Sequence, residues 1–585
     1  MNVIDSLEKI IKKLKESLNR FPYAIFFSTL TTFLLIYVIN MEDYYTPESL
    51  EIFMKIAMVA ALGFPLFLII KVFFERVENI NKFNKLAIRI AAIILLIGYY
   101  FLLLDQINMV SATRYIAVSL SLYLLFLVIP YFYKKEIFEI YVVKIFTRLF
   151  ITFIYSAILF AGLSAILFTI NELLNIPIAE IFYPSTGLTI GGIFAPIFLL
   201  AKIPKQTEKF VLKEYPDIFK ILLTYIIMPL ISIYTTILYI YFIKILVTQQ
   251  LPEGLVAHLV IWYSSLSIII LFFISPLKVK RKWIKSFRKW LPLALIPLLL
   301  MMFLAMYIRI KAYGITENRY FVVVLGLWVL GIALYYIFSK KKNNILLPLT
   351  LSLIMILSVF GPWSSYAVSI YSQNQRFESL LNKYNMVKDK KEVNNQVQIA
   401  KDDQEQIQAI IRYFKNNHSL ADIKYLPQDF KIENTEELFG FTYQKRYSPE
   451  DVNYFSYGLN TNQQAISIGS YDYLLHISNY SREFNIQKAN LQIQFDYENK
   501  EIIIKEDNNK IFSQSLIPII TALHQKNKEI RKENIDLDHV TYTAQKNDYR
   551  FKFIFNTFAG RTKNSEFGKI TISKLDFYLL IDDQK

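Results

Sequence analysis

Few side chains in this sequence have the type and spacing that catalysis or metal binding requires. The five histidines are scattered, and no metalloprotease, phosphate-loop, nucleophile-elbow or dinucleotide-binding motif is present. Asp536, Asp538 and His539 stand beside Arg531 and Lys532, a mixture more typical of a solvated turn than of a metal site. Cysteine is absent, which excludes disulfides and thiolate ligands. The sequence therefore assigns no catalytic residue, no metal and no cofactor.

A second group of charged residues points to binding. Five of them lie in gaps between apolar runs where basic residues are otherwise rare: Arg114, Glu172, Arg309, Glu317 and Arg319. One interpretation is a structural ion pair, Arg319 with Glu172 or Arg309 with Glu317, that holds the loop between two apolar runs. The other is an anion-binding surface for a phospholipid or a cell-wall precursor. The second interpretation makes all five candidate ligand-binding residues.

The segment PSTGLTIGGIFAP (Pro184–Pro196) is rich in residues that alter helix packing. Gly187 and Gly191 form a G-x-x-x-G pair, which favours close approach of another helix. Gly191, Gly192 and Pro196 could instead mark a broken helix of the kind that lines transporter sites. Close packing is the favoured interpretation, because charge deep inside the apolar runs is scarce.

Eleven apolar runs, each long enough to cross a membrane as a helix, provide the framework for these residues. Their predicted bounds are Phe21–Ile39, Ile52–Phe74, Leu86–Leu104, Tyr115–Tyr133, Phe150–Ile170, Ser185–Ala201, Ile221–Leu246, Leu255–Ser275, Trp290–Ile308, Tyr320–Phe338 and Ile345–Phe360. The fold class is therefore an α-helical polytopic membrane bundle of about 11 helices, followed by a C-terminal extramembrane α+β domain.

The distribution of lysine and arginine predicts the orientation. The N-terminus and the even-numbered gaps hold 27 basic residues, whereas the odd-numbered gaps hold 4. Positive residues concentrate on the cytoplasmic side, so the N-terminus is predicted to be cytoplasmic and the part after Phe360 to lie outside. The net charge of +16 has the same origin and matches attraction to anionic lipids. It predicts no nucleic-acid partner.

The sequence predicts four regions. Residues 1–20 form a cytoplasmic amphipathic helix, with no cleavable signal peptide, and residues 21–360 form the bundle. Residues 361–401 are a helical connector and linker, the linker being Lys388–Lys401. Residues 402–585 form the outer α+β domain, which is predicted to fold on its own.

Periodicity within the outer domain predicts its elements. Gln404–Phe414 places Ile407, Ile410, Ile411 and Phe414 on one helical stripe. Leu491, Ile493 and Phe495 alternate with polar residues, and a turn at Glu498–Lys500 before Ile502–Ile504 indicates a hairpin. A helix is predicted over Leu516–Lys526, and two further strands over Arg550–Phe555 and Lys569–Ile581.

The stretch YGITENRYFVVVLGLW (Tyr313–Trp328), followed after one more apolar run by FGPWSS (Phe360–Ser365), resembles a bacterial multi-span family known as domain of unknown function 4153. The similarity covers roughly residues 20–370. It implies an inner-membrane protein of a two-membrane bacterium, so that the outer domain is periplasmic. The resemblance supplies no activity and no catalytic residue.

Three functions fit the sequence. The favoured one is a non-enzymatic inner-membrane platform that displays a periplasmic domain for binding, with membrane lipids and an envelope protein or cell-wall component as partners. A permease or flippase for a lipid or lipid-linked substrate is the first alternative, supported by the number of spans and the Gly/Pro-rich sixth run. A membrane transferase with an outer-face site is the second, supported by the Arg/Glu loop.

Overall fold

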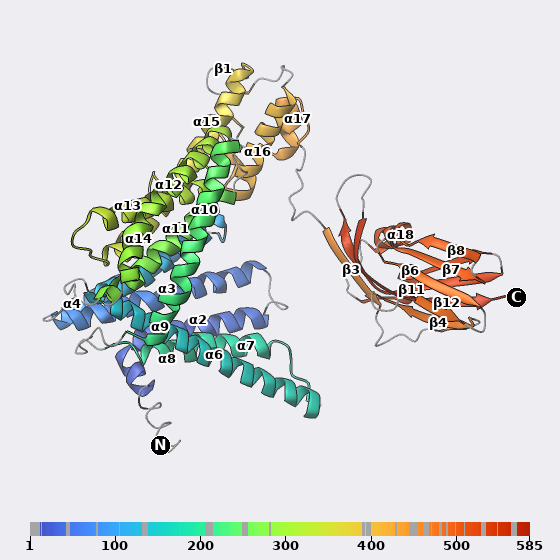
Figure 1. Ribbon diagram of the computed structural model, residues 1–585, viewed down its shortest axis with the longest axis horizontal. Coiled ribbons are helices and arrows are strands. Elements are labelled where there is room, and N and C mark those ends of the chain that lie inside the picture. Colours follow the sequence, from blue (N-terminus) through green and yellow to red (C-terminus); the bar gives the residue numbers. More distant parts are fainter. Residues whose placement is uncertain are drawn as a thin grey trace. The chain divides into compact units, whose positions relative to one another are not determined.

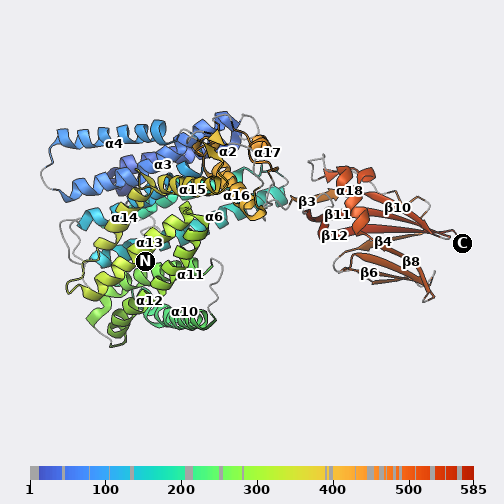
Figure 2. The ribbon, with the colours of Figure 1, turned by 90° about the horizontal axis from the view of Figure 1, so that it is seen from above.

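The chain is described by a computed structural model that divides into two compact units, Met1–Tyr443 and Gln444–Lys585. The first consists mainly of long helices and the second mainly of strands (Figures 1 and 2). The structure describes residues 12, 14–41, 47–77, 80–104, 106–131, 138–174, 176–204, 215–248, 255–279, 282–388, 392–393, 399–427, 430–443, 453–459, 467–469, 471–478, 483–486, 490–497, 499–507, 509–527, 534–546, 548–562 and 570–584. Most of the predicted helix 1–20 and linker Lys388–Lys401 lie outside these residues.

Among the described residues, ten helical segments are long and apolar enough to cross a membrane, which confirms the helical membrane bundle. Seven of them are α2 (Pro22–Met41), α3 (Pro47–Arg76), α4 (Lys82–Leu103), α5 (Met109–Val128), α6 (Phe138–Leu174), α12 (Lys282–Tyr313) and α13 (Glu317–Phe338). The other three are α7–η2–α8 (Phe182–Thr189, Ile190–Phe194, Ala195–Leu200), α9–η4–α10 (Asp217–Ile221, Leu222–Ile227, Met228–Thr248) and α11 (Leu255–Ile274).

The eleventh predicted run forms a shorter apolar helix, α14 (Leu346–Val359). It runs antiparallel to α13, as three contacts show. Tyr336 donates a hydrogen bond to Asn344 Oδ1 at 2.9 Å, Trp328 Nε1 donates to Thr350 Oγ1 at 3.0 Å, and Tyr320 donates to the Trp363 carbonyl at 2.7 Å. The segment from Asn344 to Trp363 therefore returns along α13 to the end where α13 begins. We call this end of the bundle the cap end, because the helical cap described below begins there, and we call the opposite end the basic end.

The sixth segment contains a π-helical turn, η2, where helix α2 approaches it closely. Ser28 of α2 donates a hydrogen bond to the Gly192 carbonyl at 2.5 Å, and a Cβ atom added at Gly192 would lie 1.9 Å from Thr32 Oγ1. A Cβ at Gly187 would lie 3.3 Å from a ring carbon of Phe160, whereas one at Gly191 would meet no atom within 4 Å. Pro196 lies in the first turn of α8, within a segment that stays helical. The close approach of α2 thus requires glycine at position 192.

We predict that Gly192→Ala lowers the free energy of unfolding of the purified protein by about 1–3 kcal/mol, because the added methyl group overlaps the Thr32 hydroxyl. Thermal unfolding in detergent measures this. The matched control is Gly191→Ala, which has open space and should be neutral or slightly stabilising. Adding Thr32→Ala to Gly192→Ala should recover part of the loss. Equal melting temperatures for the two single variants would contradict the prediction.

The described residues between 365 and 443 form a mainly helical structure, here called the cap, which belongs to the same compact unit as the bundle. Its elements are α15 (Ser365–Lys383), α16 (Lys401–Asn417), η6 (Leu420–Asp422), η7 (Ile432–Asn434), α17 (Thr435–Phe439) and a short pair of strands, β1 (Val387–Lys388) and β2 (Glu392–Val393). The predicted stripe of α16 is confirmed, since Ile407, Ile410, Ile411 and Phe414 are fully buried. They share a core with Phe377 and other side chains of α15.

The second unit contains two mostly antiparallel sheets around one core, which confirms an α+β tail. The larger sheet has the order β4 (Tyr473–Ile477), β12 (Ile570–Asp583), β11 (Tyr549–Thr562), β3 (Asn453–Leu459) and β9 (Asn534–Ile535), with β10 (Thr541–Lys546) also pairing with β11 and only β3–β9 parallel. The smaller has the order β5 (Glu483–Ile486), β6 (Leu491–Asp496), β7 (Glu501–Glu506) and β8 (Asn509–Ser515). The helix α18 (Ile517–Asn527) joins the same core.

The predicted elements of the second unit are found near their expected positions. The β6–β7 pair is the predicted hairpin, and Leu491, Ile493 and Phe495 face the core. The strands β11 and β12 are longer than predicted because they pair with each other over nearly their whole length. The compact unit begins at Gln444, whereas the sequence places the start of the outer domain at 402.

Candidate binding cleft at the cap end

The turn between α12 and α13 is fixed by side chains from two helices. Gly314 has φ of +69°, a conformation that glycine adopts readily. Arg319 Nη1 donates to the carbonyls of Tyr313 at 3.1 Å and Gly314 at 2.6 Å. Gln373 of α15 donates to the carbonyls of Tyr313 at 3.0 Å and Ile315 at 2.9 Å. The turn thus anchors the cap to the bundle.

Glu317, the first residue of α13, accepts hydrogen bonds from two residues of the cap. Tyr413 donates its hydroxyl to Glu317 Oε1 at 2.6 Å, and His418 Nε2 lies 2.7 Å from the same oxygen. Tyr413 and His418 are also 2.9 Å apart. The side chains of His418 and Glu317 are only 3% and 10% exposed, so water has little access to the pair. We call these three residues the Glu317 cluster.

The surroundings of the Glu317 cluster favour a carboxylate. The beginning of a helix carries a partial positive charge, which stabilises a negative group at its first residue. Burial and the hydrogen bond to Glu317 raise the pKa of Tyr413, so this phenol stays protonated and donates. A buried carboxylate with such partners is a strong link between two elements, because separating them would leave polar groups unpaired.

A polar cleft of 500 Å³ adjoins the cluster. The end of α4 and the first turns of α5, including Arg114, line part of the cleft. Residues 415–419, which span the last turn of α16 and the two positions after it, line another part together with Asp422. His418 lines this cleft and also belongs to the Glu317 cluster, so the cleft forms only when the cap is in place.

Two cations line the cleft without a carboxylate partner. Arg114 donates from Nε to the Val359 carbonyl at 3.3 Å, and its guanidinium lies 5.2 Å from the centre of the Tyr366 ring. Lys415, at the end of α16, makes no hydrogen bond or ion pair with any residue that the structure describes. The cleft also contains Asp422, whose Oδ2 accepts from the Ser419 N–H. Positive charge therefore exceeds negative charge, and the cleft suits an anionic group.

The five predicted ligand-binding residues separate in the structure. Arg114 lines the cleft, and Glu317 lies behind it, bonded to His418. Arg319 holds the turn, and Glu172 accepts a hydrogen bond from Asn171 at the surface. Arg309 is not among the residues that line the cleft. In place of the predicted pair with Arg309, Glu317 bonds to Tyr413 and His418, and in place of the predicted pair with Arg319, Glu172 bonds to Asn171.

Tyr413, Lys415 and His418 were not predicted from the sequence, because none of them belongs to a recognised motif or to the apolar stripe of Gln404–Phe414. A weak signal was available. Tyr413 and His418 are polar aromatic residues at the end of a helix whose apolar stripe was clear, and such side chains seek a partner when they are buried. Nothing in local periodicity indicates that this partner is Glu317, nearly a hundred positions earlier.

Comparison with known proteins gives the relatives of the chain. The family described as "Domain of unknown function (DUF4153)" matches residues 12–386. The chain belongs to the DUF4153 family. An uncharacterized protein of Pasteurella multocida (strain Pm70) is 26% identical over 460 residues, covering 73% of this chain and 77% of the relative. No solved structure matches.

The DUF4153 match contains the bundle and α15 but stops before α16. Arg114 and Glu317 therefore lie within the family region, whereas Tyr413, Lys415 and His418 lie beyond it. The cleft combines side chains from both parts. The chain is a multi-pass membrane protein of this family, and its role is a matter of proposal.

Proposed function

We propose that this DUF4153 protein is an inner-membrane platform that holds its cap against the bundle, presents the β unit at the same side of the membrane, and binds an anionic envelope component in the cap-end cleft. The observation that carries the proposal is the cleft itself, in which Arg114 and Lys415 stand without a carboxylate partner beside a buried structural cluster. A phospholipid or a lipid-linked cell-wall precursor has the required phosphate or diphosphate chemistry.

The separate core of the β unit supports the platform. The buried side chains of this unit pack with one another, and the cap has a different core. A unit with its own core can bind a partner independently of the bundle. The rigid link at Glu317 gives the platform a fixed cap from which the β unit follows in the chain.

The charge pattern supports a periplasmic location for the cap end. The 27-to-4 distribution of basic residues assigns the N-terminus to the cytoplasm. Because α14 returns along the whole of α13, the cap begins at the end where α13 begins. That end belongs to the gap between the ninth and tenth spans, which the charge count places outside.

No specific observation favours either of the two alternative functions, the membrane transferase or the permease. A transferase at the outer face would use Glu317 as a proton donor or acceptor, but this carboxylate is buried and bonded to Tyr413 and His418. A permease would use the Gly/Pro-rich sixth segment as a substrate site, but Gly192 there packs directly against Thr32. Both features support structural roles.

One labelling experiment tests both orientation and binding. Asn416 lines the cleft and is exposed, so Asn416→Cys introduces a single thiol into a chain without cysteine. We expect a membrane-impermeant maleimide to label this thiol from the periplasmic side. The control Lys285→Cys, at the basic end, should label only after the membrane is opened. Labelling of Lys285→Cys from the outside would contradict the orientation.

The same thiol reports on the cleft in purified protein. We expect pyrophosphate, or short-chain phosphatidylglycerol, to slow labelling at position 416. The protection should be lost in Arg114→Gln/Lys415→Gln and kept in Arg309→Gln/Lys311→Gln, which removes two charges at the same end but outside the cleft. Labelling rates that no anion changes, or equal protection in both double variants, would refute the binding function.

A further inference from the structure

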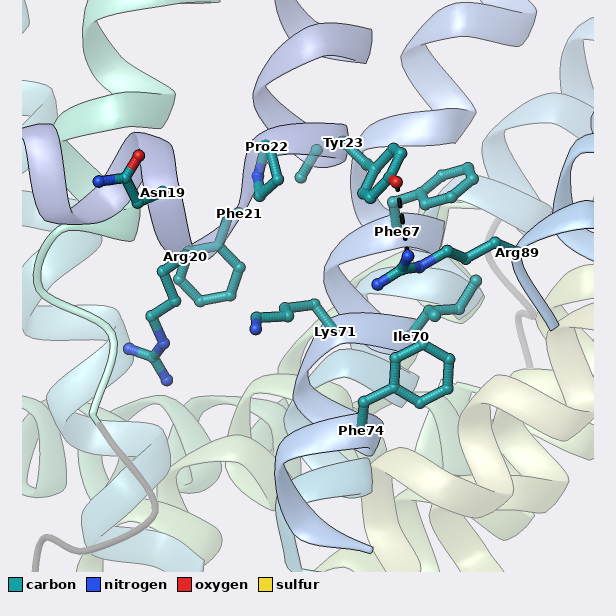
Figure 3. Close-up of a pocket in the computed structure, with 11 residues that line it drawn as sticks. Asn19, Arg20, Phe21, Pro22, Tyr23, Phe67, Ile70, Lys71, Phe74 and Arg89 are labelled. Carbon is teal, nitrogen blue, oxygen red and sulfur yellow. Dashed lines mark hydrogen bonds between the residues drawn. The ribbon is translucent and has the colours of Figure 1, made fainter. Parts of the chain in front are cut away.

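A small pocket at the basic end gathers three cations around the start of α2. It has a volume of 170 Å³ and is lined by residues 19–24, by Phe67, Ile70, Lys71 and Phe74 of α3, and by Arg89 of α4. Figure 3 shows the Lys71 side chain extending toward Phe21 and the Arg89 guanidinium beside Tyr23, to which it is hydrogen-bonded. This pocket is distinct from the cap-end cleft, since α4 contributes Arg89 from its beginning to one and Leu103 from its end to the other.

The charges of this pocket are not balanced. Glu75 binds Arg20 through two hydrogen bonds of 3.0 and 2.7 Å, and Lys71 Nζ lies 3.5 Å from the same carboxylate. Arg20 also donates to the carbonyls of Ile203 and Pro204, so it is fully used by the protein. Arg20 and Lys71 thus share one carboxylate, and Arg89, which contacts Tyr23 and Phe74, adds a third positive charge, which leaves an excess of positive charge on the Lys71 and Arg89 side.

Arg89 is held in place but remains able to donate. Its guanidinium lies 4.8 Å from the centre of the Tyr23 ring and 5.7 Å from that of Phe74, an arrangement in which two rings fix the plane of the group. Its hydrogen bond to the Tyr23 hydroxyl, at 3.4 Å, is long. An ordered guanidinium with donors to spare is suited to a phosphate, which accepts from two N–H groups at once.

An apolar groove along α2 shares the lining residue Pro22 with this pocket. It is lined by Leu18, Pro22, Ile25, Phe26, Thr29, Leu30 and Phe33 and has a volume of 420 Å³. At 1.5 Å per residue, the distance along the helix from Pro22 to Phe33 is about 17 Å, close to the length of an extended acyl chain.

We propose that the pocket and the groove together bind one anionic phospholipid, with its phosphate between Lys71 and Arg89 and an acyl chain along α2. The positively charged pocket and the apolar groove meet at Pro22. A phospholipid likewise has a charged phosphate next to apolar acyl chains. A free phosphate would use the pocket but not the groove. The site goes beyond the platform function and does not depend on it.

The experiment compares two double variants of the full-length protein by native mass spectrometry. Lys71→Gln/Arg89→Gln removes the two cations of the pocket, whereas Lys82→Gln/Lys85→Gln removes two from the first turn of α4, outside it. Delipidated protein is supplied with phosphatidylglycerol or with phosphatidylcholine. We expect the unaltered protein and the control to retain one phosphatidylglycerol in preference to phosphatidylcholine, and the pocket variant to retain about tenfold less. Equal retention by the two variants would overturn the proposal.

A third variant tests the groove without changing any charge. Thr29→Trp fills the groove beside α2 and leaves the pocket intact, so it stays informative if the pocket variant does not fold. We expect it to weaken phosphatidylglycerol retention and to leave unchanged the weak binding of glycerol 1-phosphate, the soluble head group. Full lipid retention by Thr29→Trp would mean that the groove holds no chain. Glycerol phosphate that displaces the lipid completely would reassign the pocket to a free phosphate.

Discussion

Glu317→Ala is expected to destabilise the protein by about 2–4 kcal/mol, the largest effect of any single substitution that we predict. The change removes the acceptor of both Tyr413, which is partly buried, and His418, whose side chain is only 3% exposed. Each polar group left unpaired in such a place costs about 1–3 kcal/mol. Thermal or denaturant unfolding of the full chain in detergent measures the loss.

Two variants separate the contribution of this contact from a general effect of charge. Glu172→Ala removes a carboxylate that is exposed and bonded only to its neighbour Asn171 among described residues, so it should change stability by less than about 0.5 kcal/mol. Glu317→Gln keeps an acceptor for Tyr413 and should be milder than Glu317→Ala. Limited proteolysis should cut the cap sooner in Glu317→Ala than in either. Equal stability of the two alanine variants would show that the cap is not held at Glu317.

The elements that sequence analysis located are those whose signal is local. An apolar run of membrane length, or the stripe Ile407, Ile410, Ile411 and Phe414, depends on residues a few positions apart. Such patterns determine which face of an element is buried, and that face is buried in the structure. The same reasoning cannot identify the Glu317 cluster, because its members are brought together by the packing of the cap and by no repeating pattern.

The glycines of the sixth segment show a second limit. The pair Gly187 and Gly191 predicts one contact face only if the helix keeps 3.6 residues per turn. The π-helical turn at Ile190–Phe194 widens the helix, and the residue that meets α2 is Gly192. A one-residue change of register therefore moves the close approach to a glycine that the spacing did not favour.

Composition does not divide the polar part of the chain. Residues 365–443 and 444–585 are both polar and mixed in charge, so the sequence assigns 402–585 to one domain. In the structure, α16 buries its apolar stripe against α15, and the two helices belong to the unit of the bundle. A buried stripe indicates that a helix has a partner but does not say which segment that partner is.

This division leads to a prediction about autonomous folding that differs from the one based on sequence. Residues 444–585 expressed alone are expected to be soluble and to unfold in a single cooperative transition, because both sheets and α18 share one core whose described members all lie within this unit. Circular dichroism during heating, with size-exclusion chromatography of the native sample, measures both properties.

Residues 401–585, by contrast, are expected to aggregate or to bind a hydrophobic dye. This longer segment contains α16 but lacks α15, so Ile407, Ile410 and Phe414, which are fully buried in the whole chain, would face water. The double change Ile410→Lys/Phe414→Lys places charges on that stripe and should return 401–585 to solution with the same melting transition as 444–585. If unaltered 401–585 were equally soluble and free of dye binding, α16 would have to find a partner within the β unit. If 444–585 failed to fold alone, the core of that unit would need residues before Gln444, and the cap would be part of it.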